Sequence, residues 1–228
     1  MKTGLDNKVF VFLGGIVDAI LISILWYIGS IPVFTLGASS AALYYTVHKS
    51  IFRSEGYLFS TFKRSFVENF KKGTIIWLIC LLADAFLLCD LILARSAIDR
   101  GGILSLFYYP ILVCIPLVFM WQLSIFAYQA RFEDSIRAVF CKSALIAFRN
   151  IGWMIFLTVI FVTLIYLCRY LIILTVVAPG GYTCLMHHVF EHIYEKTGWI
   201  SKEDENFAEL LYFPPNTYEG NDINNGQQ

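Results

Sequence analysis

Three of the four histidines lie in one short run, HHVFEH, at residues 187–192. On a helix His188 and His192 share a face, and a spacing of four residues also occurs in zinc sites. His187 and Glu191 share another face in the same way. No third ligand is visible nearby, and the HExxH pattern is absent. We therefore predict that this run forms the polar end of a short membrane helix and holds no metal ion and no cofactor. His188 and His192 are the pair that most resembles a metal site.

Four ionisable residues lie within long apolar runs, where charged side chains are costly and are often functional: Asp18, Asp84, Asp90 and Arg169. One interpretation is a substrate or proton pathway, and the other is a salt bridge that locks two helices together. The relative depth of Arg169 in its run lies between those of Asp84 and Asp90. We predict that Arg169 pairs with one of these aspartates in a structural role.

Motifs for catalysis are absent from the chain. It has no GxxxxGK[ST] loop for nucleotide phosphates and no GxSxG elbow for a serine nucleophile. The 6 cysteines are scattered singly through apolar stretches without a CxxC pair, which is typical of small buried side chains. We predict no catalytic residues and no enzymatic activity.

The composition indicates a membrane protein. Hydrophobic residues make up 58% of the 228 residues and charged residues only 15%, whereas soluble domains are about 25% charged. Four apolar stretches are long enough to span a bilayer, at residues 9–31, 74–94, 103–128 and 151–177. The first is too long for a signal peptide and lacks a small-residue cleavage site, so we expect it to remain as a span. Balanced charges, 17 basic and 17 acidic, give no field that would attract nucleic acid.

Two shorter apolar segments, residues 38–53 and 180–196, decide the topology. If both cross, only Arg95 and Arg100 lie outside and Arg169 lies within a span, while the other Lys and Arg residues lie in the cytoplasm. The positive-inside rule favours this arrangement over four crossings. We predict an all-α bundle of six membrane helices in a bacterial plasma membrane, with both termini cytoplasmic and a polar tail over 198–228 whose end is disordered.

Two basic amphipathic helices, about residues 57–72 and 133–149, are expected to lie in the membrane interface. Anionic lipid headgroups are their default partner, because each nearby Lys or Arg contributes about 1 kcal/mol to such binding. The same surface could instead dock a protein partner. Its basic residues are Lys63, Arg64, Lys71, Lys72, Arg137, Lys142 and Arg149.

Small residues predict where helices approach closely. Gly15, Ala19 and Ser23 recur every four residues along the first span, which is a helix-packing pattern in membranes. A similar pattern begins the next segment, after a turn marked by Pro and Gly. We expect a tight hairpin whose turn and packing residues are Pro32, Gly37, Ala41 and Ala42.

A resemblance to a known family rests on four motifs in the first half of the chain. They are LWYI at 25–28, IPVFTLG at 31–37, AALYY at 41–45 and FKxSFxENFK at 62–71. Together they resemble the YesL-like family of bacterial membrane proteins, also called DUF624, over about residues 5–197. The family usually has Gly-Pro where this chain has Gly37-Ala38.

The resemblance implies a small polytopic protein of Gram-positive bacteria whose gene lies near carbohydrate ABC importers and glycoside hydrolases. The chain lacks the EAA loop by which sugar permeases engage their ATPases. We therefore expect an accessory subunit or assembly factor of such an importer, contacting its permease subunits. The alternatives are a small oligomeric secondary transporter that uses Asp18, Asp84 and Arg169, and a sensor that binds lipid or peptide.

Overall fold

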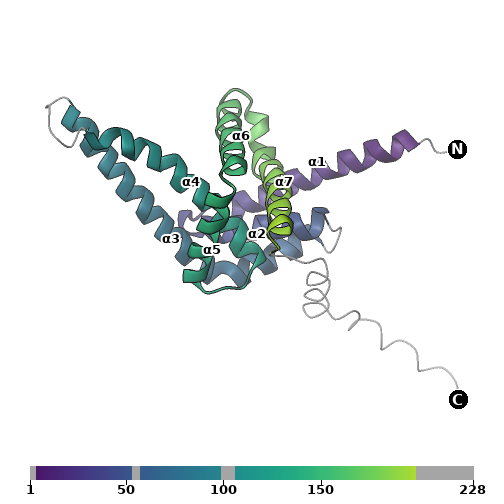
Figure 1. The fold of residues 1–228 in the computed structure, drawn as a ribbon. Helices are drawn as coiled ribbons and strands as arrows, with labels where there is room; N and C mark the ends of the chain where they lie inside the picture. Colours follow the sequence, from purple (N-terminus) through teal and green to yellow (C-terminus); the bar gives the residue numbers. More distant parts are fainter. Residues whose placement is uncertain (1–3, 53–56, 99–105, 199–228) are drawn as a thin grey trace, which may run out of the picture. The chain divides into compact units, whose positions relative to one another are not determined.

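The computed structural model describes residues 4–52, 57–98 and 106–198, with side chains from residue 14 onward. Every regular element in these ranges is helical, which confirms the all-α prediction (Figure 1). The chain divides into two compact units, Met1–Val189 and Phe190–Gln228, and the last helix runs through the boundary. Apart from Gly198, the predicted polar tail lies outside the described residues.

Seven α-helices and two short helices of other types follow one another along the described chain. They are α1 (Gly4–Gly29), a 3₁₀ turn η1 (Val33–Thr35), α2 (Leu36–Thr46), a π-helical segment η2 (Val47–Phe52), α3 (Leu58–Ile98), α4 (Tyr108–Arg131), α5 (Ile136–Arg149), α6 (Ile151–Tyr170) and α7 (Ile172–Thr197). Four of them, α3, α4, α6 and α7, are long and apolar enough to cross a membrane. A shorter apolar stretch, Gly14–Gly29, lies in α1. The count of six crossings remains a prediction.

The turn after α1 lies at the predicted place. Helix α1 ends at Gly29, and Pro32 precedes the 3₁₀ turn in an extended conformation. A proline cannot donate the backbone hydrogen bond that would continue the helix. The Thr35 hydroxyl donates to the Gly29 carbonyl at 2.7 Å, which satisfies an otherwise free group at the end of α1.

Helix α2 is the buried centre of the first unit. Its small and apolar residues are buried on nearly all sides, with Ala41 and Ala42 fully inaccessible. It packs most extensively on α3 and also contacts α1 and α4. The backbones of α2 and α3 approach closely at Gly37 and Gly73, because a Cβ added at Gly73 would lie 2.9 Å from the Ala38 Cα and 3.2 Å from the Gly37 carbonyl carbon. Gly37 therefore serves helix packing and not the turn.

The predicted interfacial helix 57–72 and the span 74–94 form one continuous helix, α3, of 41 residues. Gly73 lies between the two predicted elements, and a glycine costs a helix about 1 kcal/mol relative to alanine. Gly73 is instead helical, since its missing side chain lets α2 approach. The second predicted interfacial helix is separate from the span after it. It begins after the capping residue Ser135, whose side chain accepts a hydrogen bond from the Ala138 N–H, and ends before Asn150.

The connection between α6 and α7 differs from the prediction. Between the predicted segments 151–177 and 180–196, a turn marked by Pro179, Gly180 and Gly181 was expected, but α6 ends at Tyr170 and α7 begins at Ile172. Pro179, Gly180 and Gly181 are therefore inside α7. Local turn chemistry is overridden here by contacts with α1.

Those contacts replace the hydrogen bonding that Pro179 disturbs. Proline has no N–H to donate to the carbonyl four residues earlier, at Thr175. The Tyr27 hydroxyl of α1 donates to that carbonyl at 2.9 Å. The Gly180 N–H donates to the Ser23 hydroxyl at 2.8 Å, and this hydroxyl donates to the Ala19 carbonyl at 2.6 Å. Helix α1 thus stabilises the proline-containing part of α7.

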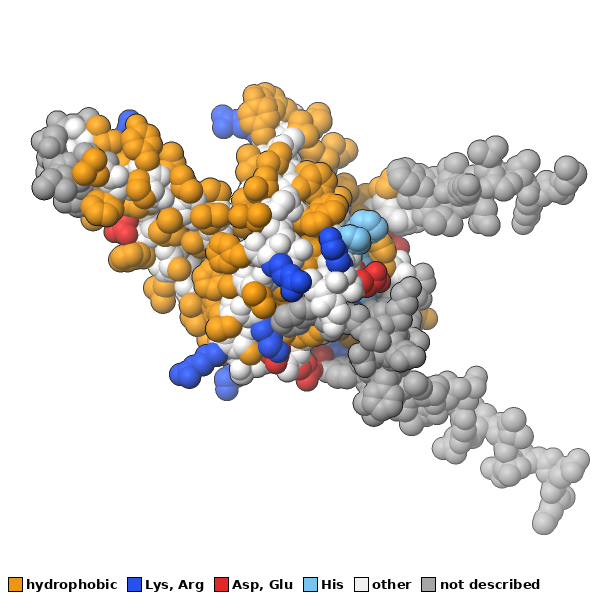
Figure 2. All heavy atoms as spheres, viewed as in Figure 1, with side chains coloured by type: hydrophobic (Ala, Val, Ile, Leu, Met, Phe, Trp, Pro, Cys, Tyr) orange, Lys and Arg blue, Asp and Glu red, His pale blue; other side chains and the backbone are white. Residues whose placement is uncertain are grey.

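The small-residue stripe of α1 is only partly used in packing. Ala19 and Ser23 are buried against Gly180 of α7, whereas the expected partner was α2. Gly15 has no neighbour within 4 Å of an added Cβ. Figure 2 shows hydrophobic side chains covering the visible outer parts of α3, α4 and α6, as expected for helices that face lipid.

Candidate functional site

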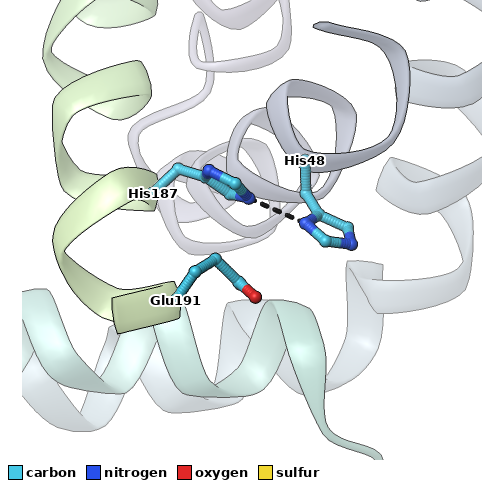
Figure 3. Close-up of side chains that lie close together, drawn as sticks. All are labelled: His48, His187 and Glu191. Carbon is cyan, nitrogen blue, oxygen red and sulfur yellow. Dashed lines mark hydrogen bonds between the residues drawn. The ribbon is translucent and has the colours of Figure 1, made fainter. Parts of the chain in front are cut away.

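The most unusual polar feature is a pair of buried histidines from distant parts of the chain. His48 Nδ1 lies 2.7 Å from His187 Nε2, within hydrogen-bonding distance (Figure 3). Only 7% of His48 and 5% of His187 are exposed. A polar pair costs free energy to bury unless its hydrogen bonds are satisfied, so its position requires an explanation.

His48 lies on η2, the π-helical segment that continues α2. A π-helix is wider than an α-helix, is rare, and occurs often at functional sites. Here it changes the direction of the side chains that follow Thr46. No sequence periodicity indicated it, because the apolar pattern of 38–53 reads as one α-helix.

Aromatic rings hold the His187 imidazole in place. The Phe52 ring is stacked on it, with centroids 4.3 Å apart and an interplanar angle of 21°. The Tyr44 ring lies 5.6 Å away in a tilted arrangement. Both aromatic residues come from α2 and η2, so the same segment that carries His48 also fixes the orientation of His187.

Arg131, the last residue of α4, determines the direction of the hydrogen bonds. Its Nη1 lies 2.9 Å from His48 Nε2. A guanidinium group can only donate, so His48 Nε2 accepts and the proton of a neutral His48 is on Nδ1. Nδ1 then donates to His187 Nε2. We assign these tautomers from the donor chemistry, and they define an ordered chain from Arg131 through His48 to His187.

The register of α7 separates the histidines of the HHVFEH run. His187 is buried, while His188 and His192 are exposed. The exposed pair is the one that was predicted from the sequence to be most like a metal site. Glu191 follows His187 by one helical turn (Figure 3). The structure thus places the second of the two equally spaced pairs on the buried side. No pattern in the sequence indicates His48 as part of this site, because it lies 139 residues before His187.

The intramembrane charges do not form the expected pair. Asp84 on α3 accepts a hydrogen bond at 2.8 Å from the Gln122 amide of α4. Arg169 is exposed in the last turn of α6, and α6 contacts α4 and α5. Among the described residues, no ion pair joins Arg169 to Asp84 or Asp90. Asp18 and Asp90 are half-buried.

The predicted basic surface lies on the first turns of α3 and on α5. Five of its residues are exposed, and Lys72 and Lys142 are half-buried; the exposed ones are Lys63, Arg64, Lys71, Arg137 and Arg149. In Figure 2, several Lys and Arg side chains gather where α5 lies in Figure 1. Arg64 forms an ion pair with Glu68 at 2.8 Å one helical turn away.

Lys142 of α5 binds the carboxylate of Asp134, in the loop before α5, at 2.8 Å. The Tyr128 hydroxyl donates to the same carboxylate oxygen. The hydrogen bond from Lys142 and then that from Tyr128 hold the pKa of Asp134 below its ordinary value of 3.8. Asp134 therefore links the end of α4 to α5 in its charged form.

Together, the helices and their exposed apolar faces indicate an integral membrane protein. A family model described as "Protein of unknown function, DUF624" matches residues 19–91, from α1 into α3. The predicted resemblance to this family is confirmed over that segment, which contains Ser23, His48 and Gly73. No curated protein and no solved structure gives a significant match.

Proposed function

We propose that this protein is a non-enzymatic accessory subunit or assembly factor of a carbohydrate ABC importer. The importer class comes from the resemblance to DUF624 proteins described above. The proposed location is the bacterial plasma membrane, with both termini in the cytoplasm. The proposed partners are the permease subunits of the importer. Copies of this chain could also associate with one another.

One observation carries this proposal, the exposed apolar surface of α3. This helix is the least buried of the four candidate spans. Leu82, Phe86 and Ile92 are 69%, 66% and 67% exposed. Such an apolar surface requires a lipid or protein neighbour. Membrane helices that pack side by side are held together by van der Waals contacts between their side chains.

The polar residues in the spans support an accessory role over transport. Asp84 is hydrogen-bonded to Gln122 on the adjacent helix, which gives it a structural partner. Arg169 is exposed at the end of α6, where a long side chain can reach the interface. A transport pathway would instead bring such charges together within the bilayer.

The test is a pull-down of the tagged protein from native membranes in mild detergent. We expect permease subunits to be recovered in near-stoichiometric amounts. Leu82→Ala with Phe86→Ala on α3 should lower their recovery severalfold, because both side chains are exposed. The matched control truncates Phe156 and Leu167 on α6, which should leave recovery unchanged.

Two results would contradict the accessory role. The first is that no partner is recovered from native membranes. The second is substrate uptake by proteoliposomes containing this protein alone, abolished by Asp84→Asn, which would establish the secondary transporter instead.

A further inference from the structure

We propose that His48 and His187 form the core of a binding site for a divalent transition-metal ion, with Glu191 as a third ligand. Imidazole nitrogens and a carboxylate oxygen are ligands that Zn²⁺ and its neighbours accept in proteins. The inference is independent of the importer proposal. It depends on the geometry of the histidine pair and on the register of α7.

The two facing nitrogens are already close to a chelating arrangement. His48 Nδ1 and His187 Nε2 are 2.7 Å apart in buried surroundings. A Zn–N bond is about 2.0–2.1 Å, so two nitrogens on a tetrahedral zinc ion lie about 3.3 Å apart. The pair needs to open by well under 1 Å, with the metal ion replacing the proton between the rings. Small rotations of the two side chains provide this.

The third ligand comes from the helix that carries His187. Residues four apart on a helix share a face, so the Glu191 carboxylate follows the His187 ring along α7 (Figure 3). Three protein ligands leave a fourth position, which is the arrangement of zinc sites that exchange a water molecule or another ligand.

Arg131 gives this site a distinctive property. Its guanidinium donates to His48 Nε2, which keeps the His48 proton on Nδ1. A metal ion bound to His48 Nδ1 requires the proton of His48 to move to Nε2. Nε2–H and the Arg131 guanidinium would then be two donors facing each other. Arg131 must therefore turn away when metal binds, and its positive charge opposes the cation. Arg131→Gln should strengthen metal binding, because a glutamine side-chain oxygen can accept a hydrogen bond from the His48 Nε2–H.

The test measures Zn²⁺ binding to the full-length protein in detergent by calorimetry, after purification without a polyhistidine tag. We expect one site, with affinity lowered at least about tenfold in His187→Gln and in His48→Gln. Arg131→Gln should raise the affinity severalfold. Co²⁺ should give the intense visible absorption of a tetrahedral complex in the wild-type protein, which needs no variant to fold.

The matched control is His188→Gln with His192→Gln, which removes two exposed imidazoles from the same helix. Retained affinity in this double variant, with loss in His187→Gln, supports the buried site. Loss of binding in the double variant would show that surface histidines bind the ion and would overturn the proposal. Absence of any Zn²⁺ or Co²⁺ binding by the wild-type protein would also overturn it.

Discussion

The Ser23 hydroxyl of α1 accepts a hydrogen bond from the Gly180 N–H of α7 at 2.8 Å. The contact occurs beside Pro179, where the internal hydrogen bonding of α7 is disturbed. Gly180 also lacks a side chain where α7 lies against Ala19 and Ser23 of α1. One residue pair therefore combines close helix packing with the satisfaction of a backbone donor in the membrane, where unpaired donors cost several kcal/mol.

Gly180→Ala should destabilise the fold by about 1–3 kcal/mol, the usual cost of overpacking. An added Cβ would lie 2.8 Å from the Ser23 hydroxyl oxygen and closer still to the Ala19 carbonyl oxygen. The free energy of unfolding can be measured by titration with denaturing detergent. The control is Gly181→Ala, whose Cβ would meet nothing within 4 Å. If both variants unfold alike, the close contact of α1 with α7 is wrong.

Gly73→Ala should also destabilise the protein by about 1–3 kcal/mol, since its Cβ would press on the Ala38 backbone of α2. Gly152→Ala on α6 is the matched control, because a Cβ added at Gly152 would meet nothing within 4 Å. We expect it to be neutral or stabilising by up to about 1 kcal/mol through helix propensity. Thermal inactivation in detergent measures both, and equal midpoints would contradict the α2–α3 contact.

The sequence predicted the helical class and the positions of the long apolar helices, because span length and hydropathy depend on local composition. It also predicted the turn at Pro32, where the missing N–H and the nearby Gly29 both act locally. It failed at Gly73 and Pro179. The predicted elements 57–72 and 74–94 left Gly73 at a boundary, and Pro179 was expected in a turn, yet both residues lie inside helices that pack on neighbours distant in sequence.

The buried histidine pair shows a similar limit. Helical spacing puts His187 with Glu191 and His188 with His192 on shared faces, and the second pair was named as the nearer approach to a metal site because both of its members are imidazoles. Periodicity alone cannot say which face is buried. The outcome depends on η2, whose π-helical geometry brings His48 to His187. The nearby Arg131 was predicted only as a cytoplasmic charge, because its contact with His48 spans 83 residues.

Gln122→Leu should cost about 0.6 kcal/mol and at most about 1.7 kcal/mol, the average and the maximum measured for side-chain hydrogen bonds between membrane helices. The substitution removes the donor to Asp84. Asp84→Asn should be nearly neutral, because the asparagine carbonyl oxygen can accept the same hydrogen bond. Unfolding by denaturing detergent measures both variants. A large loss in Asp84→Asn would show that the carboxylate charge itself matters, contrary to the structural role assigned to Asp84.

Asp134→Asn should destabilise the protein at neutral pH but not in acid. The pKa of Asp134 in the folded protein is lowered, chiefly by the hydrogen bond from Lys142. Its contribution is therefore fully present above the ordinary pKa of 3.8 and is lost as the pH falls through the lower folded value. Thermal midpoints of wild type and variant should differ at about pH 7, and the difference should shrink progressively as the pH falls below about 4.

The control for Asp134 is Glu68→Gln, which removes the exposed ion pair with Arg64 on the surface of α3. Exposed pairs of this kind contribute about 0.3–0.5 kcal/mol, so its midpoint should stay near that of wild type. Asp134 differs because Lys142 and Tyr128 bind one carboxylate from two helices. Tyr128→Phe should therefore reproduce part of the neutral-pH loss, and a wild-type midpoint in that variant would restrict the link to Lys142 alone.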